Sequence, residues 1–191
     1  HPRMPDDPII FVEVALTPDI PSSVDDLLAQ AREPAPFEAL KTATFYSISN
    51  CHPGLAGISF GNALIKQVVR LLNQELPQLD TFVTLSPIPG LSKWADGEQT
   101  PDAGMAAKYL TQAKRDDGLP LDAVARFHVG NGALVHAVHE GANSSQAGQK
   151  QSFGMMVNYL YDLEKVDENA ETYVTTLAVP MSKDIRQLTK A

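Results

Sequence analysis

The stretch Thr42–Gly90, TATFYSISNCHPGLAGISFGNALIKQVVRLLNQELPQLDTFVTLSPIPG, decides the fold. It begins with a β-like run, Thr42–Ser49, passes through a loop with three glycines, and enters an amphipathic helix over Ala63–Leu76. A second β-like run, Thr81–Leu85, follows. A strand that leads through a glycine loop into a helix directs free backbone N–H groups and the positive end of the helix dipole toward one point. We therefore predict an anion-binding loop at the start of this helix.

The composition indicates one globular domain. The chain has 191 residues, enough for a well-buried core, and we expect a single domain over residues 1–191. Hydrophobic residues make up 43% and charged residues 20%, which argues against a disordered or membrane-spanning chain. The net charge of -8 argues against broad attraction to nucleic acid or anionic lipid. We therefore expect no nucleic-acid or membrane partner, whereas a small anionic ligand remains compatible.

The cysteine content and the first residues indicate the cellular compartment in which the protein is expected. Cys51 is the only cysteine, so no internal disulfide can form and a reducing compartment is expected. The segment His1–Pro5 carries no signal-peptide apolar core, and the apolar run Ile9–Leu16 is short and interrupted by Glu13. Because residue 1 is His and not Met, the sequence is compatible with a fragment of a longer product.

The rest of the chain interleaves strands and helices early and is dominated by strands late. This order predicts an α/β fold with a mixed, partly antiparallel sheet flanked by helices. The further predicted elements are a buried strand at Pro8–Leu16, a short helix within Asp19–Glu33, a helix at Pro101–Ala113, a β-hairpin of Asp122–Val129 and Ala133–His139, a polar surface loop at Gly141–Ser152, a strand at Gly154–Leu163 and a terminal helix at Ser182–Thr189.

The glycine loop Cys51–Asn62, CHPGLAGISFGN, matches neither common nucleotide-binding motif. It lacks the Gly-Lys-Ser/Thr ending of a P-loop, and its glycine spacing is not the dinucleotide fingerprint. Glycines at intervals in a strand-to-helix turn do allow a pyrophosphate to approach backbone amides closely. A plain strand-to-helix connection fits the same spacing.

Two side chains are candidates for chemistry. Ser86 lies at the carboxyl end of a predicted strand, where α/β sheets place ligands and catalytic groups. It is not in a Gly-x-Ser-x-Gly elbow, and a serine that opens a Pro-rich turn is the alternative. His128 lies on the polar face of a predicted strand and is an acid/base candidate, the alternative being a surface or core histidine. With no Cys pair and no His-x-x-x-His helix, no metal site is indicated.

Tyr159 and Tyr161 are spaced by two and share one face of the predicted last strand. One of these hydroxyls reaches the site, or both border the core.

Six segments in a fixed order carry a resemblance to a known family. They are FYSISN at 45–50, PGLAGISFGN at 53–62, LIKQVV at 64–69, TFVTLSPIPG at 81–90, VARFHVGNG at 124–132 and MMVNYLYDL at 155–163. Together they resemble the catalytic domain of the malonyl-CoA decarboxylases. The opening and closing segments fit as well, so the resemblance spans nearly the whole chain.

The resemblance implies a fold similar to the GNAT acyltransferases, in which coenzyme A phosphates lie on the loop between a central strand and the following helix. It implies that Ser86 and His128 are the catalytic serine and histidine. The implied activity is decarboxylation of malonyl-CoA to acetyl-CoA and CO2, through a thioester enolate that the His/Ser pair protonates. No cofactor is implied, because coenzyme A is part of the substrate. The phosphate loop maps onto Ala56, Gly57, Ile58, Ser59, Phe60, Gly61 and Asn62, and the candidate substrate contacts are Asn131 and Tyr161.

The alternatives to this activity are a GNAT-type acyltransferase and a non-catalytic coenzyme A-binding module. The helical domain that precedes the catalytic domain in full-length family members is absent from these 191 residues, which leaves a homo-oligomer open. The segment His136–Ser145 lacks an Asn-Trp pair that we expect after the predicted hairpin, and the chain has no Ser-Lys-Leu ending. We expect a bacterial-type cytoplasmic protein.

Overall fold

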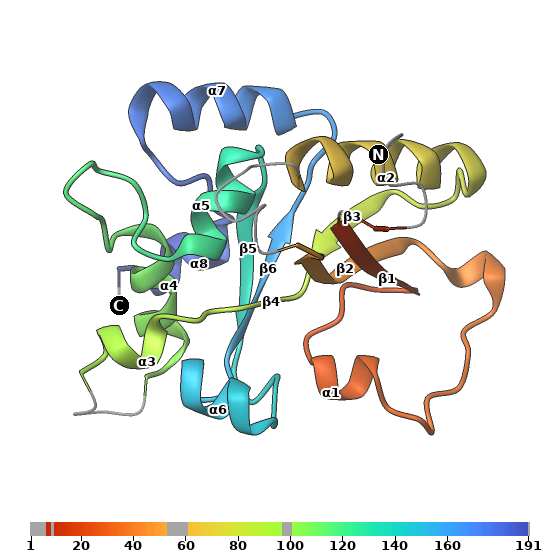
Figure 1. Cartoon of the computed structure of the whole chain (residues 1–191), viewed down its shortest axis with the longest axis horizontal. Helices are drawn as coiled ribbons and strands as arrows, with labels where there is room; N and C mark the ends of the chain where they lie inside the picture. Colours follow the sequence, from red (N-terminus) through yellow and green to blue (C-terminus); the bar gives the residue numbers. More distant parts are fainter. Residues whose placement is uncertain (1–6, 9, 53–60, 97–100, 191) are drawn as a thin grey trace.

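The computed structural model describes residues 7, 8, 10–52, 61–96 and 101–190. Figure 1 shows the strands in the middle of the molecule, with α2 and α7 along one side and α1 and α6 along the opposite side. Helices α4 and α8 pack beside β5. The elements are β1 (Ile10–Thr17), α1 (Val24–Leu27), η1 (Phe37–Ala39), β2 (Thr42–Asn50), α2 (Gly61–Glu75), β3 (Thr81–Thr84), β4 (Ser86–Pro87), α3 (Leu91–Trp94), α4 (Ala103–Thr111), α5 (Ala123–Gly130), β5 (Leu134–His139), α6 (Gln146–Ser152), β6 (Met156–Leu160), α7 (Val166–Thr176) and α8 (Lys183–Leu188).

The strands form one mixed sheet, which confirms the predicted α/β architecture. β1 pairs antiparallel with β2, β2 pairs parallel with β3, and all pairs with β6 are antiparallel. β3 and β4 follow each other along one edge of β6, and β5 lies along the other edge. The carboxyl end of β3, where β4 begins, therefore lies in the middle of the sheet beside β6.

Helix α2 forms as its sequence pattern predicts. Ile65 and Val69 are buried in the core, and further apolar side chains of the same stripe pack beside them. Lys66 and Arg70 are exposed on a different side of the helix. The strands predicted at the positions of β1, β2, β3 and β6 and the helices predicted near α1, α4 and α8 are also present.

Local side-chain caps explain several helix starts. In five helices the residue before the first turn accepts a hydrogen bond from a backbone N–H three residues on, which satisfies a donor that the helix cannot pair. These capping residues are Ser23, Asp102, Asp122, Ser145 and Ser182.

The predicted hairpin is wrong, because its first arm is helix α5. Asp122 caps this helix by accepting a hydrogen bond of 2.8 Å from the N–H of Ala125. Ala125 and Val129, four residues apart, are both buried, as expected for one helix face. The Asn-Gly signal terminates the helix instead of turning a hairpin: Gly132 has φ of +86°. The second arm of the predicted hairpin is β5.

Two other expectations need correction, and one helix was not predicted. The strand predicted to be buried at Pro8–Leu16 is β1, which pairs only with β2 among the described strands and leaves Phe11 52% exposed. The loop predicted at Gly141–Ser152 contains helix α6, which Ser145 caps. Helix α7, with Tyr173 as its buried residue, lies in a segment for which we predict no element.

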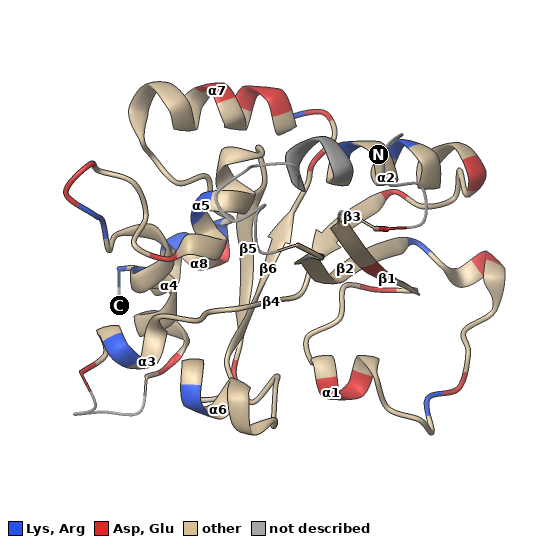
Figure 2. Ribbon diagram, in the orientation of Figure 1, with Lys and Arg blue, Asp and Glu red and all other residues tan. Residues whose placement is uncertain are grey.

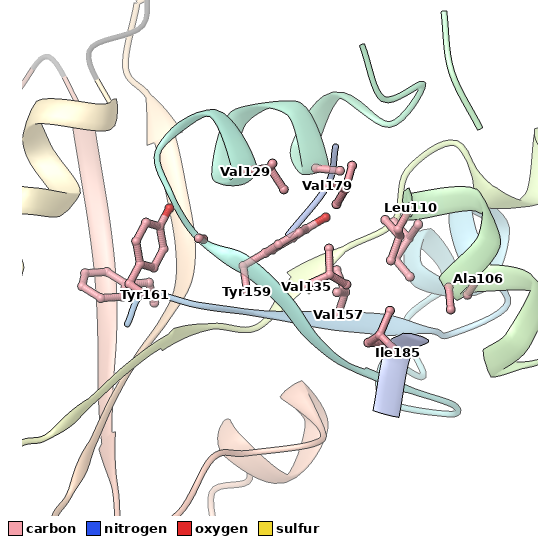
Figure 3. Close-up of a cluster of buried hydrophobic side chains, with 14 of the residues drawn as sticks. Ala106, Leu110, Val129, Val135, Val157, Tyr159, Tyr161, Val179 and Ile185 are labelled. Carbon is pink, nitrogen blue, oxygen red and sulfur yellow. The ribbon is translucent and has the colours of Figure 1, made fainter. Parts of the chain in front are cut away.

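The main core lies between the sheet and helices α2, α4, α5 and α8. Figure 3 shows Tyr159 of β6 among aliphatic side chains that include Val129 of α5 and Val135 of β5. Full burial of an aliphatic side chain contributes about 1.5–3 kcal/mol to stability. This packing fixes α5 against β6, which positions the site described below.

No helix in the described ranges is long and apolar enough to cross a membrane.

Candidate active site

Ser86 lies where the chain passes from β3 to β4. It pairs with Val157 of β6, and its side chain is buried, with 6% exposure. Its Oγ donates a hydrogen bond of 2.9 Å to Oγ1 of Thr84, two residues earlier on the same side of the chain. Thr84 Oγ1 also accepts a 3.3 Å hydrogen bond from the N–H of Tyr159. The hydroxyl of Ser86 is therefore held by two neighbouring strands.

His128 of α5 is the second predicted catalytic residue, and it meets Ser86. Its Nε2 lies 3.4 Å from Oγ of Ser86, although 42 residues separate the two in sequence. The His128 ring is 3% exposed and stacks on Tyr159, with ring centroids 4.6 Å apart. The two side chains that the sequence nominated on separate grounds thus form one buried pair.

Tyr161 approaches the other nitrogen of the imidazole. Its hydroxyl lies 2.8 Å from Nδ1 of His128. Burial raises the pKa of Tyr161, so the phenol keeps its proton and can donate it to Nδ1. When Nδ1 accepts this hydrogen bond, the one proton of the neutral ring is on Nε2. Nε2–H then faces a free lone pair of Ser86 Oγ. The hydrogen bonds then run in one direction from Tyr161 through His128 and Ser86 to Thr84.

The protonation state of His128 follows from its burial. Loss of solvent lowers the pKa of His128 from its ordinary value of 6.5 to about 3, because the buried site disfavours the charged ring. In the ligand-free protein His128 is neutral at pH 7.

Asn131 caps the C-terminal end of the same helix, and its N–H donates to the carbonyl of His128 at 3.1 Å. The residue is 5% exposed, and its side chain lies near enough to the Tyr161 hydroxyl to lower the pKa of that phenol, although within the described part of the chain its Nδ2 has no partner at good hydrogen-bond geometry. A buried amide donor without a partner is costly unless a ligand or water satisfies it. Its prediction as a substrate contact stays untested, as does that of Tyr161.

The predicted phosphate loop falls largely outside the described residues, which exclude Ala56, Gly57, Ile58, Ser59 and Phe60. Gly61 and Asn62 form the start of α2, which follows β2 in the chain as predicted. Their role in binding phosphate stays a prediction.

Among the described strands, β2 has no partner on one edge beyond Phe45, next to the strand that carries Thr84. Its pairing with β3 ends at Phe45 opposite Thr84, while β2 itself continues to Asn50. The register against β1 also shifts, because Glu13 faces Ser47 and the next residue of β1 faces Phe45. Such a bulge redirects backbone groups and is frequent beside active sites.

Sequence reasoning missed two parts of this site. Thr84 and Asn158 are fully buried, and the side-chain amide of Asn158 donates to the Thr84 carbonyl at 2.9 Å. The carbonyl oxygen of that amide contacts Nε2 of His139 at 2.5 Å. The spacing of Thr84 and Ser86 by two could have indicated a shared face, but the contact to Asn158 depends on how β3 meets β6.

No group of three or more His, Cys, Asp or Glu residues within the described ranges could hold a metal ion.

The mixed sheet and its flanking helices form a GNAT-like fold. A solved GNAT-like decarboxylase, GphF, in complex with isobutyryl-CoA shares the fold with a TM-score of 0.54 at 17% identity, over 80% of this chain and 71% of that chain. The sequence also matches the family described as "Malonyl-CoA decarboxylase C-terminal domain" over residues 1–105 and 99–191. This chain belongs to the malonyl-CoA decarboxylase family.

Two relatives from this family are similar over almost the whole chain. The crystal structure of malonyl-CoA decarboxylase from Rhodopseudomonas palustris superposes with a TM-score of 0.90 at 43% identity, over 98% of this chain and 51% of that chain. The mitochondrial malonyl-CoA decarboxylase of Anser anser anser is 31% identical over 97% of this chain and 47% of its own length. The chain thus spans about half the length of these relatives.

Proposed function

We propose that this chain catalyses the decarboxylation of malonyl-CoA to acetyl-CoA and CO2. The observation that carries the proposal is the buried contact of 3.4 Å between Ser86 Oγ and His128 Nε2, in a chain of the malonyl-CoA decarboxylase family. The two family relatives are named malonyl-CoA decarboxylases and align with almost all of this chain.

The reaction breaks the bond between the carboxylate carbon and C2 of the malonyl group. The electron pair moves into the thioester, whose oxygen becomes negative as an enolate, and CO2 leaves. Hydrogen-bond donors directed at that oxygen lower the barrier. We assign this role to backbone N–H groups of β2 near Ser47–Asn50 or of the following loop, because β2 extends beyond its pairing with β3 there.

Protonation of C2 completes the reaction and consumes one proton. The malonyl carboxylate placed against the imidazole raises the pKa of His128, because an opposite charge favours the protonated ring. His128 then takes up a proton as the substrate binds. We assign to Ser86 the relay of this proton: Nε2–H protonates the serine oxygen as the serine hydroxyl gives its own proton to C2.

Tyr161 and Thr84 hold this pair in place in the proposal. In the ligand-free protein Tyr161 donates to Nδ1 of His128 and leaves the ring proton on Nε2; once the ring takes up its second proton at Nδ1, the phenol oxygen accepts from it. Thr84 accepts from Ser86 in the ligand-free protein and so holds the serine oxygen beside Nε2; the hydroxyl turns from Thr84 to C2 when it gives up its proton. The coenzyme A phosphates are assigned to the loop Ala56–Asn62, on the strength of the β2, loop and α2 order.

The experiment is incubation of the protein with malonyl-CoA in the absence of any acceptor, with acetyl-CoA measured by chromatography. The proposal expects acetyl-CoA and an equal amount of CO2. An acyltransferase instead forms product only after an amine acceptor is added. A non-catalytic binding module shows saturable malonyl-CoA binding and no product. Folded protein that binds malonyl-CoA and yields no acetyl-CoA contradicts the proposal.

Four further parts of the proposal rest on the sequence: one catalytic domain over residues 1–191, no cofactor, assembly as a homo-oligomer, and a cytoplasmic location. Gel filtration with light scattering tests the assembly.

A further inference from the structure

A second set of hydrogen bonds joins Thr84 to strands β6 and β5. Asn158 of β6 is fully buried, and its Nδ2 donates to two backbone carbonyls, that of Thr84 at 2.9 Å and that of Pro21 at 3.3 Å. Its Oδ1 contacts Nε2 of His139 on the neighbouring strand β5. One buried amide thus connects β6 with the end of β3, with the segment after β1 and with β5.

The partners of Asn158 determine the orientation of its amide. Carbonyl oxygens can only accept, so the NH2 group faces Thr84 and Pro21 and the amide oxygen faces His139. Nε2 of His139 must then carry a proton and donate it to the amide oxygen. With the amide turned over, its oxygen would face two carbonyl oxygens, and buried acceptors would lose their donors. His139 therefore completes the set of hydrogen bonds that holds this amide in one orientation.

Asn158 acts at an interruption in the sheet. The register places pairs on both sides of Thr84 and none opposite it: the flanking pairs are Val83 with Leu160 and Ser86 with Val157. At this interruption the Thr84 carbonyl accepts from the Asn158 side chain, and the Thr84 hydroxyl oxygen accepts from the N–H of Tyr159. The same hydroxyl oxygen accepts from Ser86 Oγ. The placement of Thr84 by Asn158 is therefore passed on to Ser86.

Neutral groups make these contacts. Figure 2 shows β4, β5 and β6 without Asp, Glu, Lys or Arg along their lengths. The position of Thr84 thus depends on hydrogen bonds that weaken steeply when their geometry changes. We propose that Asn158 and His139 are positioning residues: His139 orients the Asn158 amide, and this amide holds Thr84 and, through it, the Ser86 hydroxyl beside His128. This role rests on the proposed function.

The first test measures the tautomer of His139 and needs no turnover. In protein labelled with ¹⁵N at histidine, the neutral ring of His139 should carry its proton on Nε2. Asn158→Leu keeps the bulk of the side chain but removes the amide, so the shifts of His139 should move toward a mixture of tautomers. A wild-type His139 with its proton on Nδ1, or unchanged shifts in a folded Asn158→Leu variant, overturns the inference.

The second test measures steady-state turnover of malonyl-CoA. His139→Leu should lower kcat about fivefold with KM unchanged, because one neutral hydrogen bond is lost away from the substrate. His139→Gln retains an N–H donor and should restore kcat to near the wild-type value. His136→Leu is the matched control, since His136 is another partly buried histidine of β5 and lies outside this set of hydrogen bonds, and it should turn over as the wild type does.

The outcomes separate this inference from the proposed function. A folded wild type that forms no acetyl-CoA overturns both. In an active wild type, equal kcat for His139→Leu and the wild type overturns the inference alone, as does a glutamine variant that is as slow as the leucine variant. A lower unfolding temperature of His139→Leu with unchanged kcat would show a purely structural contact, and it likewise contradicts the positioning role.

Discussion

The hydroxyl of Tyr161 lies 2.8 Å from Nδ1 of His128, on the side of the ring opposite to Ser86. A buried neutral imidazole has one donor and one acceptor, and the partner of one nitrogen decides the role of the other. Tyr161 therefore determines that Nε2, which faces Ser86, carries the proton. Substitutions at Tyr161 and at the residues bonded to this chain of hydrogen bonds should therefore have measurable effects.

Tyr161→Phe should lower kcat about tenfold with little change in KM, because one hydrogen bond that orients the ring is lost while the ring stays packed. Steady-state turnover of malonyl-CoA measures the rate. The ¹⁵N chemical shifts of His128 should move from the Nε2–H tautomer toward a mixture of tautomers. Shifts that stay as in the wild type contradict the positioning role.

Thr84→Val keeps the shape of the side chain but removes the oxygen that accepts from Ser86 and from the N–H of Tyr159. We expect a loss of about 1–3 kcal/mol in the free energy of unfolding, because a buried N–H loses its partner, together with slower turnover. Thr84→Ser is the control, since it keeps the oxygen and should restore turnover. Equal turnover by the valine and serine variants would show that the hydroxyl has no role.

His128 should make the protein less stable in acid. The unfolded imidazole titrates near 6.5, whereas burial holds the pKa in the folded state at about 3. Below pH 6.5 the unfolded state binds more protons, so the stability present above that pH is lost as pH falls toward 3. For this group the loss between pH 7.5 and pH 5 is about 2 kcal/mol.

The measurement is urea unfolding at both pH values, for the wild type and His128→Asn. Burial raises the pKa of Asp122, which has the opposite effect on acid stability, so only the difference between the two proteins isolates His128. The pH dependence should be shallower in the variant. Parallel curves would contradict a neutral buried histidine.

Gly132→Ala should destabilise the turn between α5 and β5 more than Gly141→Ala destabilises the loop after β5. Both glycines have positive φ, which costs an alanine about 1 kcal/mol. A Cβ at Gly132 would also collide with the carbonyl of Val166, whereas a Cβ at Gly141 meets nothing within 4 Å. Thermal unfolding of both variants tests the comparison, and equal midpoints would contradict it.

Much of the fold could be predicted because local pattern and tertiary packing agree. The apolar stripe of α2 is the stripe that the sheet buries, and Pro77 follows the helix. In α5 the two disagree. Ala-Val-Ala-Arg-Phe-His-Val suits a strand as well as a short helix, and the Asn-Gly that follows serves a hairpin or a helix end equally. The N-cap at Asp122 and the stacking of His128 on Tyr159 favour the helix.

The candidate site was predictable in its residue types but not in its electrostatics. Ser86 and His128 were nominated from their positions in the sequence, and their contact arises only because α5 packs against β6. The pKa of His128 depends on complete burial, which no local motif encodes. Helix α7 carries one buried residue, Tyr173, in a polar sequence, so its pattern was too weak to predict.

The most direct test of the account is a double-mutant cycle on single-turnover rates of malonyl-CoA decarboxylation. It compares the wild type, Ser86→Ala, His128→Asn and the double variant, each saturated with substrate and checked for unchanged coenzyme A binding. If Ser86 and His128 act as one unit, His128→Asn removes most of the rate and the double variant is no slower than it. Near wild-type rates in the single variants, or losses that multiply in the double variant, would contradict a joint role.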